Sequence, residues 1–337
     1  MNKSNVAIVV PVYNVEKYLN CCLDSLNIQT DKRFTVFAVD DGSSDSSGQI
    51  LDNLACKYPW LQVYHKANGG VSSARNYALD RIDPEKYKYI AFVDPDDFVT
   101  PNFIYDFLKA ADDNNVDCVV CGVVSFDRRG DVNNAMNTES DRKIGIQEVS
   151  DMFFGQGYWK RENIFSARFL SNKCYLLDRV REIRFNENMR AGEDQDYFIR
   201  ALSCVRTGFL VSRANYRYRL RKTSLTRTIT CDEYNIKLYL QILKENELTD
   251  KSRMGVILSL FDSWWQELKQ SYVNRDEKGV IFCKEIFNEV YKYYRDIKTD
   301  FKYTKRFMIY KLGDGVCRLY FCLRKNKNID YKKNYFE

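Results

Sequence analysis

In FTVFAVDDGSSD, residues 34–45, an apolar run passes directly into acidic and turn-forming residues, and this pattern indicates the fold class. Its apolar part predicts a buried strand over 34–39, and Asp45 or a neighbouring serine is suited to cap a following helix. Strand, polar loop and helix recur in this order around 6–13 and 88–93. Strands and helices that alternate through short loops are typical of a parallel, doubly wound sheet. The predicted fold class is therefore α/β.

The second half of the chain changes in character twice. Between 125 and 165 the periodicity weakens, which predicts loops and a short helix. Beyond residue 232 the apolar spacing is helical throughout. Helices are predicted there over 233–248, 252–272 and 278–296. The expected domains are residues 1–228 and a helical module over 229–337.

Charge is placed unevenly along the 337 residues. The net charge is +6, and residues 298–337 alone carry 11 Lys and Arg against 4 Asp and Glu. From totals of 52 and 46, this leaves 41 basic and 42 acidic side chains in the rest of the chain. A basic, aromatic tail predicts an anionic partner, either a membrane surface or a nucleic acid. The neutral body and the carboxylate-lined loops count against a nucleic-acid binder.

The tail also carries an apolar face at helical spacing. Its residues are flanked by lysine and arginine: Met308, Leu312, Val316, Leu319 and Leu323. This pattern is typical of a helix that lies in the plane of an anionic membrane surface. Packing of the same face against the protein's own core is the alternative, and Gly313 and Gly315 count against one continuous helix.

Cysteine use and hydropathy indicate the compartment. The 11 cysteines are scattered, their number is odd, and no signal peptide is recognised, so we expect a reduced, cytoplasmic chain. Cys118 and Cys121 lie in an apolar run and are interpreted as core thiols rather than metal ligands. No apolar stretch reaches the ~18 residues that a membrane span needs.

Three carboxylates stand within four residues after strand 88–93, in the motif Asp94-Pro95-Asp96-Asp97. Such crowding is unfavourable unless a cation or a helix N-terminus offsets the repulsion. Mg²⁺ and Mn²⁺ take carboxylate oxygens together with substrate phosphates, so a metal site is one explanation. A turn with a capping aspartate is the other, and Asp97 is its best candidate.

The loops after the other strands place polar groups at the same sheet edge, where open α/β sheets bind ligands. Asp41 can accept a hydrogen bond from a base or ribose, or simply belong to a turn. Tyr13 offers an aromatic edge for a base, or core packing. Gly70 and Arg75 predict a turn and a helix whose guanidinium reaches phosphate, with a solvated arginine as the alternative. Pro11 stands where a dinucleotide fold would place its glycines, which counts against an NAD enzyme.

Glu193 and Asp194 begin a further predicted helix, where a carboxylate can act as a general base or as a helix cap. His65 is the only histidine, so proton transfer falls more readily to a carboxylate. A basic cluster in a predicted loop suits a diphosphate, or is a solvated positive face. Its polar residues are Arg217, Arg219, Arg221, Lys222, Ser224 and Arg227.

Taken together, five motifs in this order resemble the family 2 glycosyltransferases with the GT-A fold, particularly the bacterial enzymes of capsule, exopolysaccharide and O-antigen assembly. They are PVYN at 11–14, VDDGSSD at 39–45, NGGVSSARN at 68–76, FVDPDD at 92–97 and GED at 192–194. The resemblance covers about residues 5–228 and implies a Rossmann-like, mostly parallel central sheet. It implies a nucleotide-binding half over about 1–115 and an acceptor and catalytic half over about 116–228. It says little about the helical module.

The resemblance also implies roles for the matching residues. Contacts to the nucleotide-sugar fall to Pro11, Tyr13, Asp41, Gly70, Arg75, Asp94, Asp96, Lys173, Arg219 and Arg221. Asp96, with Asp94, would hold Mn²⁺ or Mg²⁺. Asp194 matches the family's catalytic base, with Glu193 beside it. The QxxRW segment and membrane spans of processive synthases are lacking, which implies transfer of a single sugar.

The expected function is an inverting, metal-dependent hexosyltransferase of surface polysaccharide biosynthesis. It would move one sugar from a UDP-sugar to a lipid-linked or oligosaccharide acceptor and form a β-glycosidic bond. The expected location is cytoplasmic, with peripheral contact to the inner face of the membrane. Two alternatives remain from the sequence. A sugar-nucleotide nucleotidyltransferase would usually show a glycine-rich, basic loop after the first strand, which is missing here, and the other alternative is a non-catalytic nucleic-acid binder.

Overall fold

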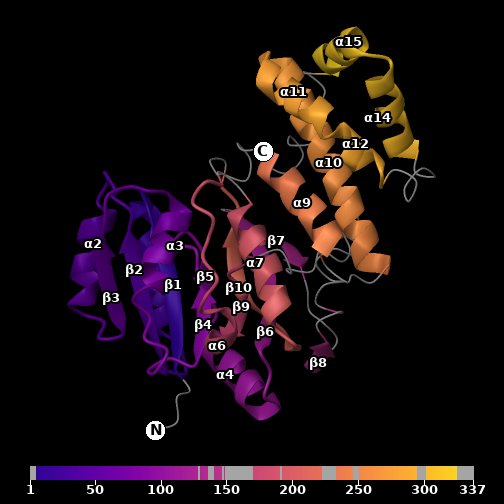
Figure 1. Cartoon of the computed structure of the whole chain (residues 1–337). Helices are drawn as coiled ribbons and strands as arrows, with labels where there is room; N and C mark the ends of the chain where they lie inside the picture. The colour runs from indigo at the N-terminus through magenta and orange to yellow at the C-terminus, as the bar shows by residue number, and fades with distance from the viewer. Residues whose placement is uncertain are drawn as a thin grey trace. The chain divides into compact units, whose positions relative to one another are not determined.

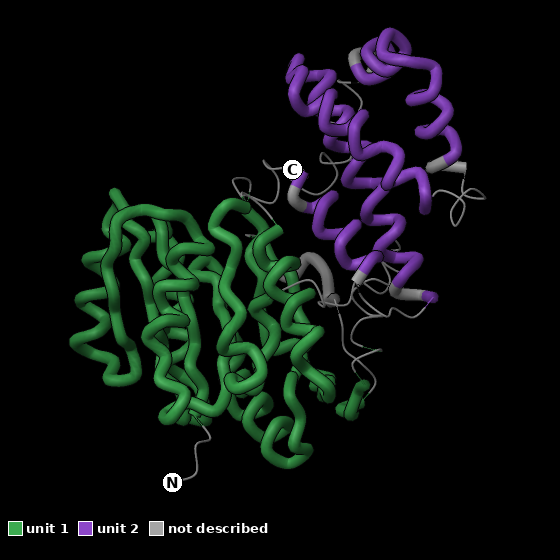
Figure 2. Tube along the Cα trace, viewed as in Figure 1, with its two compact units in different colours: residues 1–224 green, residues 225–337 purple. Residues whose placement is uncertain are grey.

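The chain forms two compact units, residues 1–224 and residues 225–337 (Figure 2). The predicted boundary lies a few residues later. The computed structural model describes residues 5–127, 130–135, 140–145, 148, 170–189, 192–221, 233–245, 250–293 and 301–324.

The first unit alternates strands and helices. Its strands are β1 (Val6–Val12), β2 (Phe34–Asp40), β3 (Leu61–His65), β4 (Tyr89–Phe92), β5 (Phe98–Val99), β6 (Cys118–Asp127), β7 (Gly130–Ala135), β8 (Arg142–Gly145), β9 (Lys173–Leu176) and β10 (Thr207–Arg219). Its helices are α1 (Glu16–Asn27), α2 (Ser47–Ala55), α3 (Val71–Leu79), α4 (Phe103–Asn114), α6 (Leu177–Val180) and α7 (Glu193–Cys204).

The described strands join into one sheet with the path β3-β2-β1-β4-β9-β6-β10-β5, and β7 and β8 pair with β6 and β10 off this path (Figure 1). Strands β1 to β4 are mutually parallel, as are β6 and β10. Strand β9 runs antiparallel to both of its neighbours, β4 and β6. Chain order reverses between β1 and β4, which makes this edge a topological switch point, the place where open α/β sheets bind ligands.

Strand β1 is the centre of the core because every one of its seven residues is buried. Alternate side chains of a strand point to opposite faces, so the even-numbered ones share one side. Val6, Ile8 and Val10 belong to the same apolar cluster as Leu19 of α1 and Phe107 of α4. Strand β1 therefore needs apolar cover on both faces, which explains its uninterrupted hydrophobic run.

The predicted fold class is confirmed, with three differences in detail. The basic cluster was predicted in a loop, but Arg217 and Arg219 lie in β10 and pair with Val124 and Phe126 of β6. The strands β5, β7 and β8 were not predicted, because each is short and polar or lies where the periodicity weakens. Antiparallel β9 interrupts the parallel order that the alternation implied. Cys118 and Cys121 are buried thiols, as expected.

The second unit is helical in its described part. Its helices are α9 (Glu233–Glu245), α10 (Asp250–Asn274), α11 (Glu277–Glu285), α12 (Phe287–Tyr291), α14 (Phe301–Lys311) and α15 (Asp314–Arg324). Trp264 of the long helix α10 is 1% exposed, and its Nε1 donates to the carbonyl of Cys283 at 3.0 Å. The helix predicted over 278–296 is broken, because Ile286 lies between α11 and α12. Among the described residues, no helix is long and apolar enough to span a membrane.

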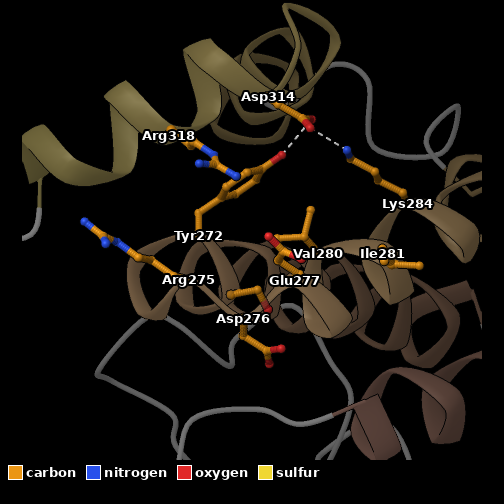
Figure 3. A pocket seen from close by; sticks show the side chains of 10 residues that line it. Tyr272, Arg275, Asp276, Glu277, Val280, Ile281, Lys284, Asp314 and Arg318 are labelled. Carbon is orange, nitrogen blue, oxygen red and sulfur yellow. Dashed lines mark hydrogen bonds and ion pairs between the residues drawn. The ribbon is translucent and has the colours of Figure 1, made fainter.

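The start of α15 is tied to two other helices. The hydroxyl of Tyr272 in α10 donates to Asp314 Oδ1 at 2.8 Å, and Lys284 of α11 lies 2.5 Å from Asp314 Oδ2. Figure 3 shows both side chains reaching Asp314 across a pocket of about 300 Å³. The guanidinium of Arg318 lies over the ring of Tyr272. These contacts fix the direction in which α15 leaves the turn that precedes it.

Candidate active site

The loops that follow β1 and β2 are bonded to each other at the carboxyl edge of the sheet. Asn14, in the left-handed region at φ 50°, donates its backbone N–H to Ser43 Oγ at 3.1 Å and accepts from Ser44 N at 2.8 Å. Asp45 accepts from the backbone of both Glu16 and Ser47, the first residues of α1 and α2. One carboxylate therefore caps two helices, which satisfies backbone donors that each helix start leaves open.

Asp41 organises the glycine turn that precedes α3. It is 2% exposed and accepts from Lys66 Nζ at 2.6 Å, from Gly69 N at 3.0 Å and from Gly70 N at 2.7 Å. Gly42, at φ +71°, stands close to this turn, since a Cβ there would lie 2.9 Å from Asn68 N. The loop after β2 and the glycine turn after β3 are thus bonded to each other and form one rim of the site.

Arg75 of α3 is the central cation of the site. It is 3% exposed, and its Nη1 lies 2.6 Å from Asp194 Oδ1 and 3.1 Å from Glu193 Oε1. Its Nη2 lies 3.1 Å from Asp94 Oδ1. The guanidinium also packs on Phe185, 5.0 Å from the ring centroid. A single buried arginine therefore joins the aspartate loop after β4 to the first turn of α7.

This network sets the protonation of its members. Burial would lower the pKa of Arg75, but the charges of Asp194, Asp94 and Glu193 raise it. Burial raises the pKa of Asp194 to about 6, against the opposing charge of Arg75. Burial also raises the pKa of Asp94. A carboxylate whose pKa lies near neutrality is suited to general-base chemistry, because it accepts a proton while still largely ionised.

A second basic side chain acts electrostatically on the same carboxylate. Lys173 opens β9, is fully buried, and donates to Asn172 Oδ1 at 2.9 Å. Its Nζ lies 4.7 Å from the centroid of the Phe198 ring. Burial lowers the pKa of Lys173 to about 7. Its charge in turn favours the ionised form of Asp194.

The aspartate loop is clamped from the opposite side by β10. Asp97 is fully buried and accepts from Tyr216 OH and from Arg219 N, both at 2.7 Å. Arg219 Nε also donates to the backbone carbonyl of Asp96 at 2.6 Å. Arg221 Nε lies 2.6 Å from Asp96 Oδ2. Burial and the neighbouring aspartates raise the pKa of Asp97 well above its usual range. Asp97 is therefore a structural residue that fixes the loop.

Comparison with known proteins assigns the fold to a family. Residues 7–171 match the family model "Glycosyl transferase family 2". This segment of the N-terminal unit belongs to the family. A curated relative is the glycosyltransferase EpsJ of Bacillus subtilis (strain 168), 33% identical over 223 residues, which are 66% of this chain and 62% of EpsJ. GgaB of the same strain, a minor teichoic acid biosynthesis protein, is 32% identical over 64% of this chain and 23% of its own length. The chain thus spans less than two thirds of either relative.

A solved structure shares the fold. The S. aureus TarS fragment in complex with UDP-GlcNAc superposes with a TM-score of 0.61 at 22% identity, over 80% of this chain and 74% of that fragment. The similarity supports the GT-A type of sheet with helices after it.

The residues predicted for this family 2 site fall into three groups. Arg75, Asp94, Glu193 and Asp194 contact one another directly. Asp96, Arg219 and Arg221 form the neighbouring cluster, and Lys173 lies buried nearby. Along the rim, Pro11 is buried in β1, Tyr13 is 50% exposed, and Asp41 holds Gly70. Lys222, Ser224 and Arg227 lie outside the described residues. The roles of all these residues in binding and catalysis stay predictions.

Several residues of the site were missed from the sequence. Phe185 packs on Arg75, Tyr216 links Asp94 N to Asp97, and Lys66 neutralises Asp41. Lys66 could have been found, since it stands two residues before the Asn68-Gly69-Gly70 turn. His65 does not reach this network. It bridges Asp40 and Asp52 at 3.0 Å each.

Proposed function

We propose that this chain is a glycosyltransferase that moves one sugar from a UDP-sugar to a saccharide acceptor, with Asp194 as the base. The observation that carries the proposal is the shared guanidinium of Arg75. It brings a carboxylate with a pKa of about 6 to the same place as the aspartate loop beside the switch point of the sheet. Membership in the family supports sugar transfer. A UDP-linked donor is supported by TarS, which binds UDP-GlcNAc.

In this proposal Asp194 removes the proton from the acceptor hydroxyl as that oxygen attacks the anomeric carbon. The bond from this carbon to the diphosphate oxygen breaks, so that UDP leaves. A single base without a covalent nucleophile gives inversion, hence a β-linked product from an α-linked donor. A positioned base typically contributes about 10²–10⁴-fold in rate. The positive charge of Arg75, and that of Lys173 when it is protonated, favours the ionised form of this carboxylate.

The proposal includes a divalent ion, Mg²⁺ or Mn²⁺, on Asp96 with Asp94. Both side chains offer the hard oxygen ligands that these ions prefer, and their raised pKa values reflect burial among like charges, which a cation would relieve. Within the described part of the chain, no group of three or more His, Cys, Asp or Glu residues is arranged to hold a metal. We therefore propose that nucleotide phosphate oxygens complete the ligand set. Arg221 would then exchange Asp96 for the diphosphate.

Charge balance favours this arrangement. The diphosphate of a UDP-sugar carries two negative charges and a divalent ion carries two positive charges, so the pair enters without adding net charge to a buried site. The acceptor is proposed to be a surface glycan or a lipid-linked precursor of one. EpsJ and GgaB, a glycosyltransferase and a teichoic acid biosynthesis protein, support this class.

The test is thermal unfolding of the full chain with UDP, GDP or ATP, each with and without Mn²⁺. Stabilisation by UDP that requires the metal is expected, and it should be lost in Asp96→Ala. Unchanged, metal-dependent UDP binding by Asp96→Ala would remove this residue from the metal site. Selective stabilisation by GDP or ATP would refute the donor class. Incubation with UDP-sugars and glycan acceptors then identifies the sugar.

A further inference from the structure

The turn between α14 and α15 presents an apolar surface that is rimmed by lysine. We call its residues the corner patch: Lys305, Met308, Lys311, Leu312, Val316 and Leu319. Met308, Leu312 and Leu319 are 62%, 68% and 62% exposed, and Val316 is 38% exposed. They belong to the last turn of α14, the residue after it and the first two turns of α15. Large apolar side chains exposed so close together are unusual on a soluble surface.

The opposite sides of the same helices are already packed. Phe307 and Ile309 of α14 and Cys317 and Phe321 of α15 are buried, and Phe321 lies 4.9 Å from Trp265 between ring centroids. The helical core of the unit therefore uses different residues from the corner patch. The sequence left open whether these helices pack against the protein's own core. They do pack on their own unit, and they still expose a second face.

The path of the chain creates the corner. Gly313 has φ +94°, a conformation that glycine adopts without strain, and it ends α14 one residue before α15 begins. Lys284 and Tyr272 then hold the first residue of α15 through Asp314 (Figure 3). The apolar side chains are thus presented on an ordered turn, rather than on one straight helix as the spacing alone had suggested.

The positive charge around the corner patch indicates that its partner is anionic. Residues 301–324 contain six Lys and Arg and one acidic residue, Asp314, whose carboxylate is paired with Lys284. Lys305 and Lys311 are exposed, and neither forms an ion pair with any carboxylate that the structure describes. A second copy of this surface would bring these lysines against one another. An anionic surface would pair with them while the apolar side chains leave water.

We propose that the corner patch inserts into an anionic phospholipid surface, with Met308, Leu312 and Leu319 in the headgroup–acyl boundary and Lys305 and Lys311 on lipid phosphates. Apolar side chains flanked by lysine are the recognised chemistry of such in-plane contacts. Each lysine near an anionic leaflet changes the partition coefficient about five-fold. The proposal stands apart from sugar transfer, since its test needs no activity.

The test is co-sedimentation of the full chain with phosphatidylglycerol-containing vesicles, with vesicles of phosphatidylcholine alone for comparison. Wild type is expected to bind only the anionic vesicles and to be released by salt. The double variant Lys305→Gln/Lys311→Gln should lower the partition coefficient about 25-fold. The triple variant Met308→Ser/Leu312→Ser/Leu319→Ser should lose binding even at low salt. Ile28→Ser is the matched control, because Ile28 is 58% exposed on the N-terminal unit.

Three outcomes would overturn the proposal. One is the absence of wild-type binding to anionic vesicles at low salt. Another is equal loss of binding in Ile28→Ser and in the triple variant. The third is a wild-type dimer in sedimentation velocity that the triple variant abolishes while vesicle binding is absent, which would assign the patch to a second copy of the chain. Unchanged circular dichroism is expected for every variant, because all substituted side chains are exposed.

Discussion

Replacing Asp194 by asparagine is predicted to stabilise the protein while it removes sugar transfer. Asp194→Asn keeps the shape of the side chain and deletes one negative charge from the Arg75 network. Arg75 keeps two carboxylate partners, Asp94 and Glu193, so its own charge stays compensated. The wild-type residue, by contrast, is ionised at neutral pH at a cost, because burial raises its pKa to about 6 from the ordinary aspartate value of 3.8.

The size of the gain follows from that shift. A pKa unit corresponds to about 1.4 kcal/mol, so a shift of about two units sets an upper limit near 3 kcal/mol. The Asp194 side chain is 32% exposed, which screens part of the penalty. The start of α7 also favours a carboxylate by about 0.5 kcal/mol. We therefore expect Asp194→Asn to raise the free energy of unfolding by about 1–2 kcal/mol, which corresponds to about 2–8 °C in the unfolding temperature of a unit of this size.

The gain depends on pH in a defined direction. The raised pKa means that the native state binds more protons than the unfolded state between about pH 4 and 6, so the contribution of Asp194 to stability falls as pH rises through this window. Above pH 6 the wild type carries the whole penalty, and the asparagine variant carries none. Below pH 4 both side chains are neutral, so the difference between the two unfolding temperatures should disappear.

The measurement is thermal unfolding of wild type and variant at pH 8 and pH 4, together with UDP binding and transfer rates. Transfer should fall about 10²–10⁴-fold with UDP binding retained. Asp196→Asn is the control on the same helix, and it should destabilise because Asp196 is paired with Arg200. A lower unfolding temperature of Asp194→Asn at pH 8 would refute the electrostatic argument. Loss of UDP binding would refute the role as base.

Two further predictions concern the scaffold. Asn76→Ala should lower the free energy of unfolding by about 2–3 kcal/mol in urea titrations, because Asn76 pairs with both the backbone N–H and the carbonyl of Phe185, and a loss below 0.5 kcal/mol would contradict this role. Gly42→Ala should cost about 1–3 kcal/mol in the same assay, because the residue has φ +71° and the added Cβ would lie 2.9 Å from Asn68 N; Gly145→Ala, with nothing within 4 Å, is the control that should change little.

The sequence predicted those parts of the fold that depend on local pattern. Strand β1 follows from an uninterrupted apolar run, and it ends one residue before the end of the expected range of 6–13. The place of β9 could not be predicted in this way. Its pairing partners, β4 and β6, lie far from it in sequence, and an apolar run does not state the direction of its neighbours. The break at Ile286 was missed for a similar reason, since the helical spacing continues across it.

In the candidate site, too, local features could be predicted from the sequence and long-range contacts could not. The motifs placed aspartates at strand ends because the polar loop after a buried strand is a local feature. Arg75 was predicted to reach phosphate, because a guanidinium forms strong charge-assisted hydrogen bonds with it, and a solvated arginine was the alternative. Its observed partners, Glu193 and Asp194, lie 118 and 119 residues away in the chain. No spacing rule connects such residues, and only the burial of α3 against the sheet brings them together.

The burial of Arg75 nevertheless has a physical requirement that limits which residues can surround it. A guanidinium that is 3% exposed must be paired, because an unpaired buried charge costs several kcal/mol. Three acidic side chains supply that pairing, and two of them come from opposite ends of the site, Asp94 from the loop after β4 and Asp194 from α7. Any ligand that recruits Asp94 must therefore share or replace its contact with Arg75. Arg75 would then interact more strongly with Asp194 and favour its ionised form. Binding of the donor and ionisation of the proposed base are therefore linked through one side chain.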